Sequence, residues 1–256
     1  MSSTNKYTVK LTLCEKFKGI IWKVETDYKL NIVAIETRDA ESHTTAISAF
    51  DFSTGRCLFK ELQVEDSWNW GLDRVTSGII FVHGYISEKS PEHKGIIALN
   101  ELGEVAWQHY NKTLYTIGEE GLIAYNPSVQ PRMLELLSPQ NGQMIKYGIK
   151  EYNSVHRDII VPEVVNQDAL PDKSLAENIA GPILFAQLKG KDIFSFHMVN
   201  GNTFSQKLVV YEHDNIILNE FLAINIQKFN PEAFFIEHNH LFCIRNNKQE
   251  FVSYLV

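Results

Sequence analysis

Short apolar runs rich in β-branched and aromatic residues recur along the whole chain, separated by polar clusters of Gly, Asn, Asp, Ser and Thr. The longer spacing of apolar residues that marks amphipathic helices is nearly absent. This pattern is typical of a protein built from many antiparallel strands. The clearest example is the C-terminal segment, where two tight turns join three predicted strands at 233–237, 240–245 and 250–256.

Three predicted hairpins share one plan, in which an apolar strand, a polar turn that ends on glycine and a second strand follow one another. The turn glycines are Gly55, Gly103 and Gly142, which lie 48 and 39 residues apart. Glycine suits a tight turn because it accepts a positive φ at little cost. Two further segments, 209–218 and 242–252, show the same plan with Asp-Asn or Asn-Asn at the turn, residues that tolerate the left-handed region best after glycine.

Repeats of about 40 to 50 residues with about four strands each are typical of propeller blades. We therefore predict an all-β fold, a small β-propeller of about five four-stranded antiparallel blades, forming a single domain over residues 1–256. A predicted strand at 7–14 could pair with the C-terminal strands and close the ring, which removes exposed sheet edges. Two packed antiparallel sheets would give similar local patterns.

One part of the chain departs from the repeat. Asp214 follows Gly142 at a spacing of 72 residues, more than one blade needs, and the excess is assigned to an insertion at about 151–180. Ser174 and Glu177 there have capping-box spacing, so we expect a short helix near 172–180. Long insertions on regular scaffolds are often functional, and this one could serve as a docking element for another subunit.

The segment from Ala98 to Trp107, "ALNELGEVAW", resembles the tryptophan-docking repeat of quinoprotein-type propellers, roughly Ala-x-Asp-x-x-Thr-Gly-x-x-x-Trp. The segment "FDFSTGRCLF" is a weaker copy, with Phe59 at the Trp position. This resemblance implies a propeller fold and not the quinone, because adjacent cysteines are missing and the chain is short. As a whole, the sequence resembles an uncharacterised domain-of-unknown-function family of Bacteroidetes-type bacterial proteins, and that resemblance implies no activity.

Composition narrows the partner classes. The net charge is −7 and the 24 basic residues form no cluster, so a nucleic-acid partner is disfavoured. No apolar run approaches the ~18 residues needed to cross a bilayer, and the first 22 residues lack the apolar core of a signal peptide. We expect a cytoplasmic protein that interacts with neither nucleic acid nor membrane.

The segment "IIFVHGY" at 79–85 resembles the His-Gly strand end with which α/β-hydrolases form an oxyanion hole. Such enzymes also need a Gly-x-Ser-x-Gly nucleophile elbow and helices covering a parallel sheet. The chain has neither, so we do not expect an α/β-hydrolase.

Loop lengths point to one functional face. In a four-stranded blade, the loop between the second and third strands and the connection to the next blade emerge on the same face, and here these segments vary most: 37–42, 65–74, 86–94 and 151–180. The predicted ligand-binding residues are Trp68, Trp70, Tyr85, Arg157 and Asp158, because exposed aromatic rings beside polar groups suit ligand contact. The two tryptophans could instead pack between blades, on one strand face.

We expect a non-catalytic binding module that presents this face to a small molecule, peptide or protein partner. The alternative is a hydrolase or lyase that uses His83, His93 or His156 as acid or base. No spacing of metal ligands or phosphate-binding glycines stands out, so no cofactor and no metal are predicted.

Overall fold

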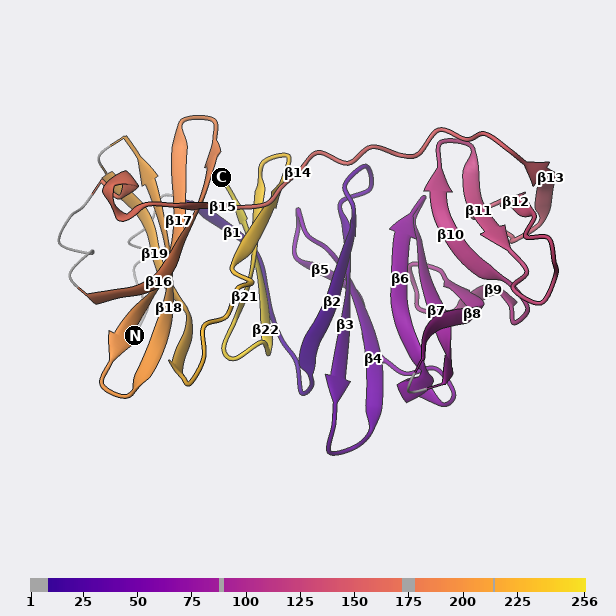
Figure 1. Ribbon diagram of the computed structural model, residues 1–256, viewed down its shortest axis with the longest axis horizontal. Helices are drawn as coiled ribbons and strands as arrows, with labels where there is room; N and C mark the ends of the chain where they lie inside the picture. Colours follow the sequence, from indigo (N-terminus) through magenta and orange to yellow (C-terminus); the bar gives the residue numbers. More distant parts are fainter. Residues whose placement is uncertain (1–8, 88–89, 172–177, 214) are drawn as a thin grey trace. The chain divides into compact units, whose positions relative to one another are not determined.

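The computed structural model describes residues 9–87, 90–171, 178–213 and 215–256 (Figure 1). Within these ranges the chain forms five antiparallel sheets of four or five strands and two short 3-10 helices. The predicted all-β class is therefore confirmed. No helix in the described ranges is long and apolar enough to cross a membrane.

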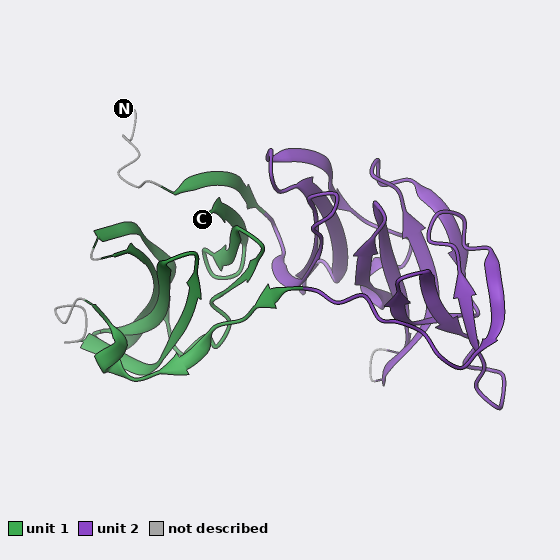
Figure 2. Ribbon diagram, turned by 90° about the horizontal axis from the view of Figure 1, so that it is seen from above, with its two compact units in different colours: residues 1–16, 158–256 green, residues 17–157 purple. Residues whose placement is uncertain are grey.

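The chain divides into two compact units, shown in Figure 2. Unit 2 is the continuous segment 17–157, and unit 1 combines 1–16 with 158–256.

Unit 2 contains three four-stranded sheets whose strands follow chain order. The first sheet is β2 (Ile20–Asp27), β3 (Ile32–Asp39), β4 (Thr44–Asp51) and β5 (Arg56–Leu62). A 3-10 helix, η1 (Ser67–Asn69), leads to the second sheet, β6 (Trp70–Thr76), β7 (Ile79–Ser87), β8 (Ser90–Leu99) and β9 (Val105–His109). The third is β10 (Thr113–Gly118), β11 (Gly121–Tyr125), β12 (Leu134–Leu137) and β13 (Met144–Ile149).

Unit 1 contains two five-stranded sheets. One has the order β15 (Glu163–Val165), β16 (Ile179–Leu188), β17 (Lys191–Asn200), β18 (Thr203–Glu212) and β19 (Asn215–Ile226). The other has the order β1 (Lys10–Lys16), β22 (Glu250–Leu255), β21 (His240–Arg245), β20 (Phe234–Glu237) and β14 (Ile159–Ile160). The three predicted C-terminal strands and the pairing of the N-terminal strand with them are confirmed, with Leu13 opposite Ser253.

The predicted insertion at 151–180 is more regular than a loop. Strands β14 and β15 lie within it and extend the edges of the two unit 1 sheets, and a 3-10 helix, η2 (Gln167–Ala169), follows. The helix expected near 172–180 falls largely outside the described residues, since 172–177 are not described and Ile179 already begins β16.

The turn glycines behave as the pattern predicts. Gly55, Gly103 and Gly142 all have positive φ, at 77°, 78° and 66°, and Asn246 and Asn247 take the same region at 52° and 54°. These are conformations that residues other than Gly, Asn and Asp adopt at a cost.

In unit 2 the turn glycines also receive an aromatic ring from the preceding sheet. The Trp107 indole of β9 lies against Gly142, where a Cβ atom would stand 2.6 Å from the ring, and its Nε1 donates to the carbonyl of Pro139 at 2.8 Å. Phe59 of β5 lies in the same way against Gly103, at 3.0 Å from a Cβ position. Each sheet of unit 2 is thus joined to the next by an aromatic side chain, and apolar residues of the inner strands fill the space between them.

Replacing Gly142 by Ala is expected to lower the free energy of unfolding by about 2–6 kcal/mol. About 1–3 kcal/mol comes from the positive φ and a similar amount from forcing a methyl group into the Trp107 ring. The matched control is Gly148→Ala in the same sheet, where φ is 71° but the nearest atom to a Cβ is the flexible end of Met133. Chemical denaturation followed by tryptophan fluorescence measures both, and equal losses in the two variants would show that the ring contact is unimportant.

Candidate functional site

A group of polar side chains lies between the first and second sheets of unit 2, where the surroundings are otherwise apolar. Glu36, Asp73 and His83 are buried in it, with 1%, 8% and 4% of their surfaces exposed. Burying a charged group is costly unless it has compensating partners, so we looked for the partners of each of these side chains. We call the set the inter-sheet cluster; its members are Glu36, Arg38, Asp73, His83, Tyr85 and His93.

Strand alternation and one bulge bring the cluster together. Side chains two positions apart on a strand share a face, which accounts for Glu36 with Arg38 on β3 and His83 with Tyr85 on β7. On β8, the partner of His83 is Ile96 but the partner of Tyr85 is His93, so β8 carries one extra residue. This bulge, where Gly95 has a φ of 104°, sets His93 opposite Tyr85 on the cluster's face.

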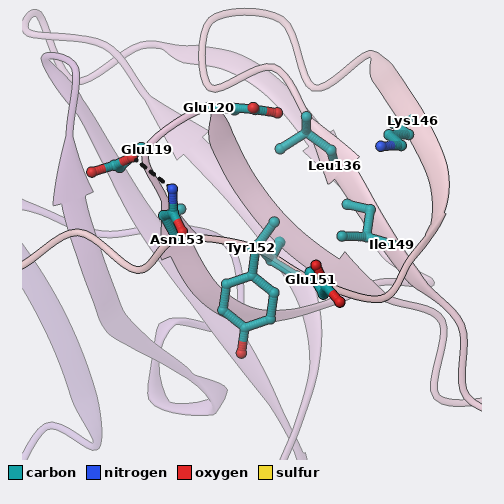
Figure 3. Close-up of a pocket in the computed structure, with 10 residues that line it drawn as sticks. Glu119, Glu120, Leu136, Lys146, Ile149, Glu151, Tyr152 and Asn153 are labelled. Atoms are coloured by element: carbon teal, nitrogen blue, oxygen red, sulfur yellow. Dashed lines mark hydrogen bonds between the residues drawn. The ribbon is translucent and has the colours of Figure 1, made fainter.

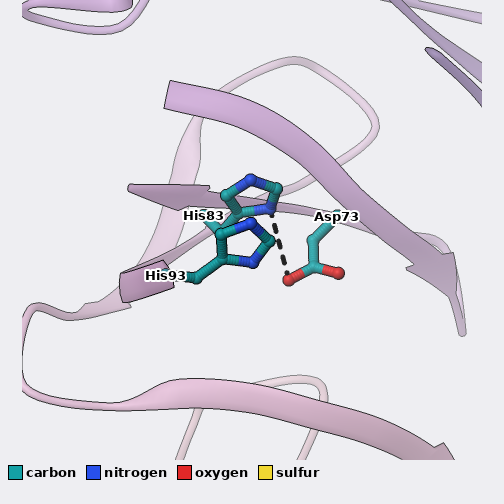
Figure 4. A group of neighbouring side chains, drawn as sticks. All are labelled: Asp73, His83 and His93. Atoms are coloured by element: carbon teal, nitrogen blue, oxygen red, sulfur yellow. Dashed lines mark ion pairs between the residues drawn. The ribbon is translucent and has the colours of Figure 1, made fainter. Parts of the chain in front are cut away.

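The two imidazoles are stacked beside the Asp73 carboxylate (Figure 4). Their ring centroids are 3.5 Å apart and their planes differ by 11°. Asp73 Oδ2 lies 3.5 Å from His83 Nδ1, an ion-pair contact that is long for a hydrogen bond. Both ring nitrogens of His83 are buried, with no hydrogen-bond partner among the described residues.

The close approach of these strands depends on Gly71. A Cβ atom at that position would lie 3.2 Å from Glu36 Oε2, 3.2 Å from Tyr85 Oη and 3.3 Å from His83 Nε2. The three polar atoms therefore surround the one residue that has no side chain to displace them.

The cluster shifts the acidity of its members. Burial by itself would raise the pKa of Asp73, but the contact with His83 and the charges of His83, Lys23 and Arg74 outweigh it and hold that pKa below its ordinary value. Burial first, and then the charge of His83, lowers the pKa of His93, while Asp73 partly opposes this shift. Burial and the nearby Glu36 raise the pKa of Tyr85.

A chain of ion pairs continues from Asp73 along β2. Lys23 Nζ donates to the carbonyl of Asp73 at 2.8 Å and lies 3.5 Å from Glu25. Glu25 also contacts Arg74 at 3.3 Å and Arg157 at 3.0 Å. The last contact ties the end of unit 2 to its first strand.

On the other side of the cluster, aromatic rings surround the Arg38 guanidinium. Its Cζ atom lies 5.3 Å from the ring centroids of Trp22 and Trp68 and 5.5 Å from that of Tyr85. Its Nε donates to Glu36 at 2.7 Å, whereas its Nη2 is buried without a hydrogen-bond partner in the described part of the chain. Trp22 is 66% exposed, so this group, which we call the Arg38 group, opens to solvent.

The structure brings four of the predicted site residues together and separates the others. His83, His93, Tyr85 and Trp68 lie in or beside the inter-sheet cluster. The predicted loops at 65–74 and 86–94 are largely regular, because β6 begins at Trp70 and β8 already begins at Ser90, so His93 lies in a strand.

Trp70 is not part of this group. It begins β6, packs against the apolar core of the first two sheets, and makes an edge contact with Tyr110. Trp68 instead belongs to η1 and stacks on His43. The two tryptophans therefore do not share a strand face, because the 3-10 helix interrupts the alternation between them.

His156 and Arg157 lie elsewhere in unit 2. Together with Arg74 and Tyr28 they line a hollow formed by segments of all three sheets. Asp158, the third residue of that predicted stretch, is exposed and belongs to unit 1. The predicted binding set is thus divided, and only Arg157 reaches the ion-pair chain.

Figure 3 shows a separate hollow in the third sheet, lined by Glu119, Glu120, Glu151 and Lys146 among others. Asn153 donates to Glu119 there at 3.2 Å. None of the buried polar atoms that lack a hydrogen-bond partner in the described ranges lies in it. We therefore regard the inter-sheet cluster, and not this hollow, as the candidate site.

In chelator-treated protein, the pKa of His93 is expected below its ordinary value of about 6.5. His93 then takes up a proton less readily in the folded state than in the unfolded chain. The free energy of unfolding is therefore unaffected by His93 above pH ~6.5 and decreases as the pH falls below that value. Asp73→Asn should lower the pKa of His93 further, because a carboxylate that favours the imidazolium is removed. Titration of the ring resonances by NMR measures this, with Glu101→Gln in an exposed turn as control. An unchanged or raised pKa in Asp73→Asn would show that the two groups are not coupled.

Residues 26–107 match the family model described as "Domain of unknown function (DUF4905)". This range includes all six residues of the inter-sheet cluster. No curated protein matches the sequence. Among solved structures, the chain is similar to one titled "Bifunctional GH43-CE Bacteroides eggerthii", with 8% identity and a TM-score of 0.26 over 93% of this chain. The chain spans 32% of that protein, and a TM-score this low does not indicate a shared fold. The comparisons thus connect the segment that carries the candidate site with an uncharacterised domain, and with no activity.

Proposed function

We propose that the chain is a non-catalytic binding module, and that the Arg38 group is where it contacts its ligand. The observation that carries this proposal is the surrounding of one guanidinium by three aromatic rings, one of which is two-thirds exposed. Exposed tryptophan and tyrosine beside arginine give large contact area with few rotatable bonds, and such residues dominate binding energies.

The chemistry of the group favours a small ligand with a flat apolar face and a hydrogen-bond acceptor. The exposed Trp22 ring offers the stacking surface. The Arg38 Nη2 has an unused N–H, and a ligand acceptor that reached it would satisfy a buried donor, which is worth more than a contact in water. A peptide or protein side chain of the same chemistry would use the same two features.

We further propose that the five sheets are the blades of one propeller-like domain over residues 1–256, with repeats of the tryptophan-docking type. Two observations support this arrangement. Trp107 and Phe59 each rest on the turn glycine of the next sheet, which is the role the aromatic position has in such repeats. The first and last strands also share a sheet, as a closed ring requires.

The second candidate is a hydrolase or lyase with His83 or His93 as acid or base. It is favoured by the Asp73 carboxylate beside His83, since an adjacent carboxylate commonly orients a catalytic imidazole. His156 belongs to neither arrangement, because it lies with the second hollow.

The binding proposal is tested by a thermal-shift screen with nucleotides, sugars, amino acids and dicarboxylates, because a ligand that binds only the native state raises the unfolding midpoint. At least one compound class is expected to raise the midpoint of the wild type and to have at least about tenfold weaker affinity for Trp22→Ala. The matched control is Leu102→Ala, which removes a side chain that is 72% exposed in the β8–β9 turn.

If no compound shifts the midpoint and pull-downs recover a stable protein partner, the small-molecule form of the proposal is wrong. Turnover of a bound compound that His83→Asn abolishes would support the enzyme instead.

A further inference from the structure

We propose that Asp73, His83 and His93 bind a divalent transition-metal ion of the Zn²⁺ class. This inference is independent of the ligand-binding role of the Arg38 group. The three residues offer one carboxylate oxygen and two imidazole nitrogens, and these donor atoms all lie within 4.8 Å of one another. Two imidazoles and a carboxylate are a ligand set that suits zinc, and such a set leaves a fourth position open.

The distance between the donor atoms of Asp73 and His83 fits two ligands of one zinc ion. Zinc bonds of about 2.0–2.2 Å in a tetrahedral arrangement set neighbouring donor atoms roughly 3.3–3.5 Å apart. Asp73 Oδ2 and His83 Nδ1 are 3.5 Å apart, longer than a good hydrogen bond and close to the separation that two ligands of one ion have.

The state of His83 points to a missing partner. Its side chain is 5% exposed, and neither ring nitrogen has a hydrogen-bond partner among the described residues. A buried imidazole in this state loses its hydration without replacement, which is unfavourable. A metal ion at Nδ1 would satisfy the nitrogen that faces Asp73, and the opposite nitrogen, Nε2, lies in the same small space beside Gly71 as the Glu36 carboxylate.

Binding requires one movement. The two rings are parallel, whereas an ion must lie near the plane of each imidazole that binds it. His93 is the less buried of the two and lies at the edge of the β8 bulge, so we assign the rotation to its side chain. His83 and Asp73 keep their positions.

The neighbouring cationic side chains weaken the expected affinity of the site for a metal ion. Arg74 lies 3.8 Å from the Asp73 carboxylate and Lys23 donates to the backbone carbonyl of Asp73, so a dication bound at that carboxylate has two cations close to it. Glu25 offsets part of their charge through its own contacts with both. We therefore expect a dissociation constant in the micromolar range, weaker than that of a structural zinc site.

Calorimetric titration of the chelator-treated full chain with Zn²⁺ tests the site, with Co²⁺ as a spectroscopic probe of tetrahedral ligation. One ion per chain is expected, and Mg²⁺ should not compete, because it prefers oxygen ligands alone. Asp73→Asn, His83→Asn and His93→Asn should each weaken binding at least about tenfold. His93→Asn is the most informative variant, because His93 is only half-buried and lies beside the β8 bulge, so it is the ligand least needed for folding.

His238→Asn, in an exposed turn of unit 1 at a φ of 55°, is the matched control and should bind like the wild type. Circular dichroism and cooperative unfolding establish that each variant folds. If Zn²⁺ binds folded His93→Asn and the wild type equally, or raises the unfolding midpoint of neither, the site does not exist as assigned.

Discussion

A single buried carboxylate, that of Glu36, joins the fold of unit 2 to its candidate site. Its Oε2 accepts the backbone N–H of Leu72 at 2.7 Å, which links β3 of the first sheet to β6 of the second. Its Oε1 accepts the Nε–H of Arg38 at 2.7 Å. A carboxylate that is 1% exposed is tolerated only when its charge and its lone pairs are matched, and these two contacts provide both.

The contacts of Glu36 also explain why the site lies at the joint between the two sheets. The guanidinium that neutralises Glu36 is the one around which Trp22, Trp68 and Tyr85 gather, so the aromatic rings are positioned by the same charge that links the sheets. On the other side, Glu36 shares the space beside Gly71 with His83 and Tyr85. Stability and site geometry therefore depend on the same few atoms.

Much of the fold was predictable, because turn chemistry is local. The glycines at 55, 103 and 142 and the asparagines at 246 and 247 mark their turns by the φ values they alone accept easily. The aromatic positions of the repeats, Phe59 and Trp107, follow from the same spacing. Strands of two or three residues such as β14 and β15 were not predictable, since they exist only because a longer strand of unit 1 offers them an edge.

The site was predictable only in part. His83, Tyr85 and His93 stand out because they flank one hairpin, but Glu36, Arg38 and Asp73 were missed. Arg38 and Asp73 fall in the segments 37–42 and 65–74, which the sequence assigned to loops, and Glu36 falls near the end of a predicted strand, so none of the three charges stood out. What could have identified Glu36 is its place after the apolar run Ile32–Ile35, since a central strand buried on both faces has no solvated side for a carboxylate. The β8 bulge places His93 on the face of the cluster, and the 3-10 helix η1 places Trp68 apart from Trp70. Both depend on backbone geometry that the pattern of residues does not predict.

The pairing of β1 with β22 has a consequence for how the chain folds as it is made. Thr12 and Ser253 are hydrogen-bonded across 241 positions, so β1 is synthesised long before its partner strand β22. Unit 2 is one continuous segment and has all of its strand partners once residue 157 has emerged. Because contiguous units fold first during synthesis, unit 2 acquires its structure while β1 still has an open edge. The unit that carries the inter-sheet cluster therefore has all its strands before unit 1 does, and β1 presents an unpaired edge, open to wrong association, until β22 is made.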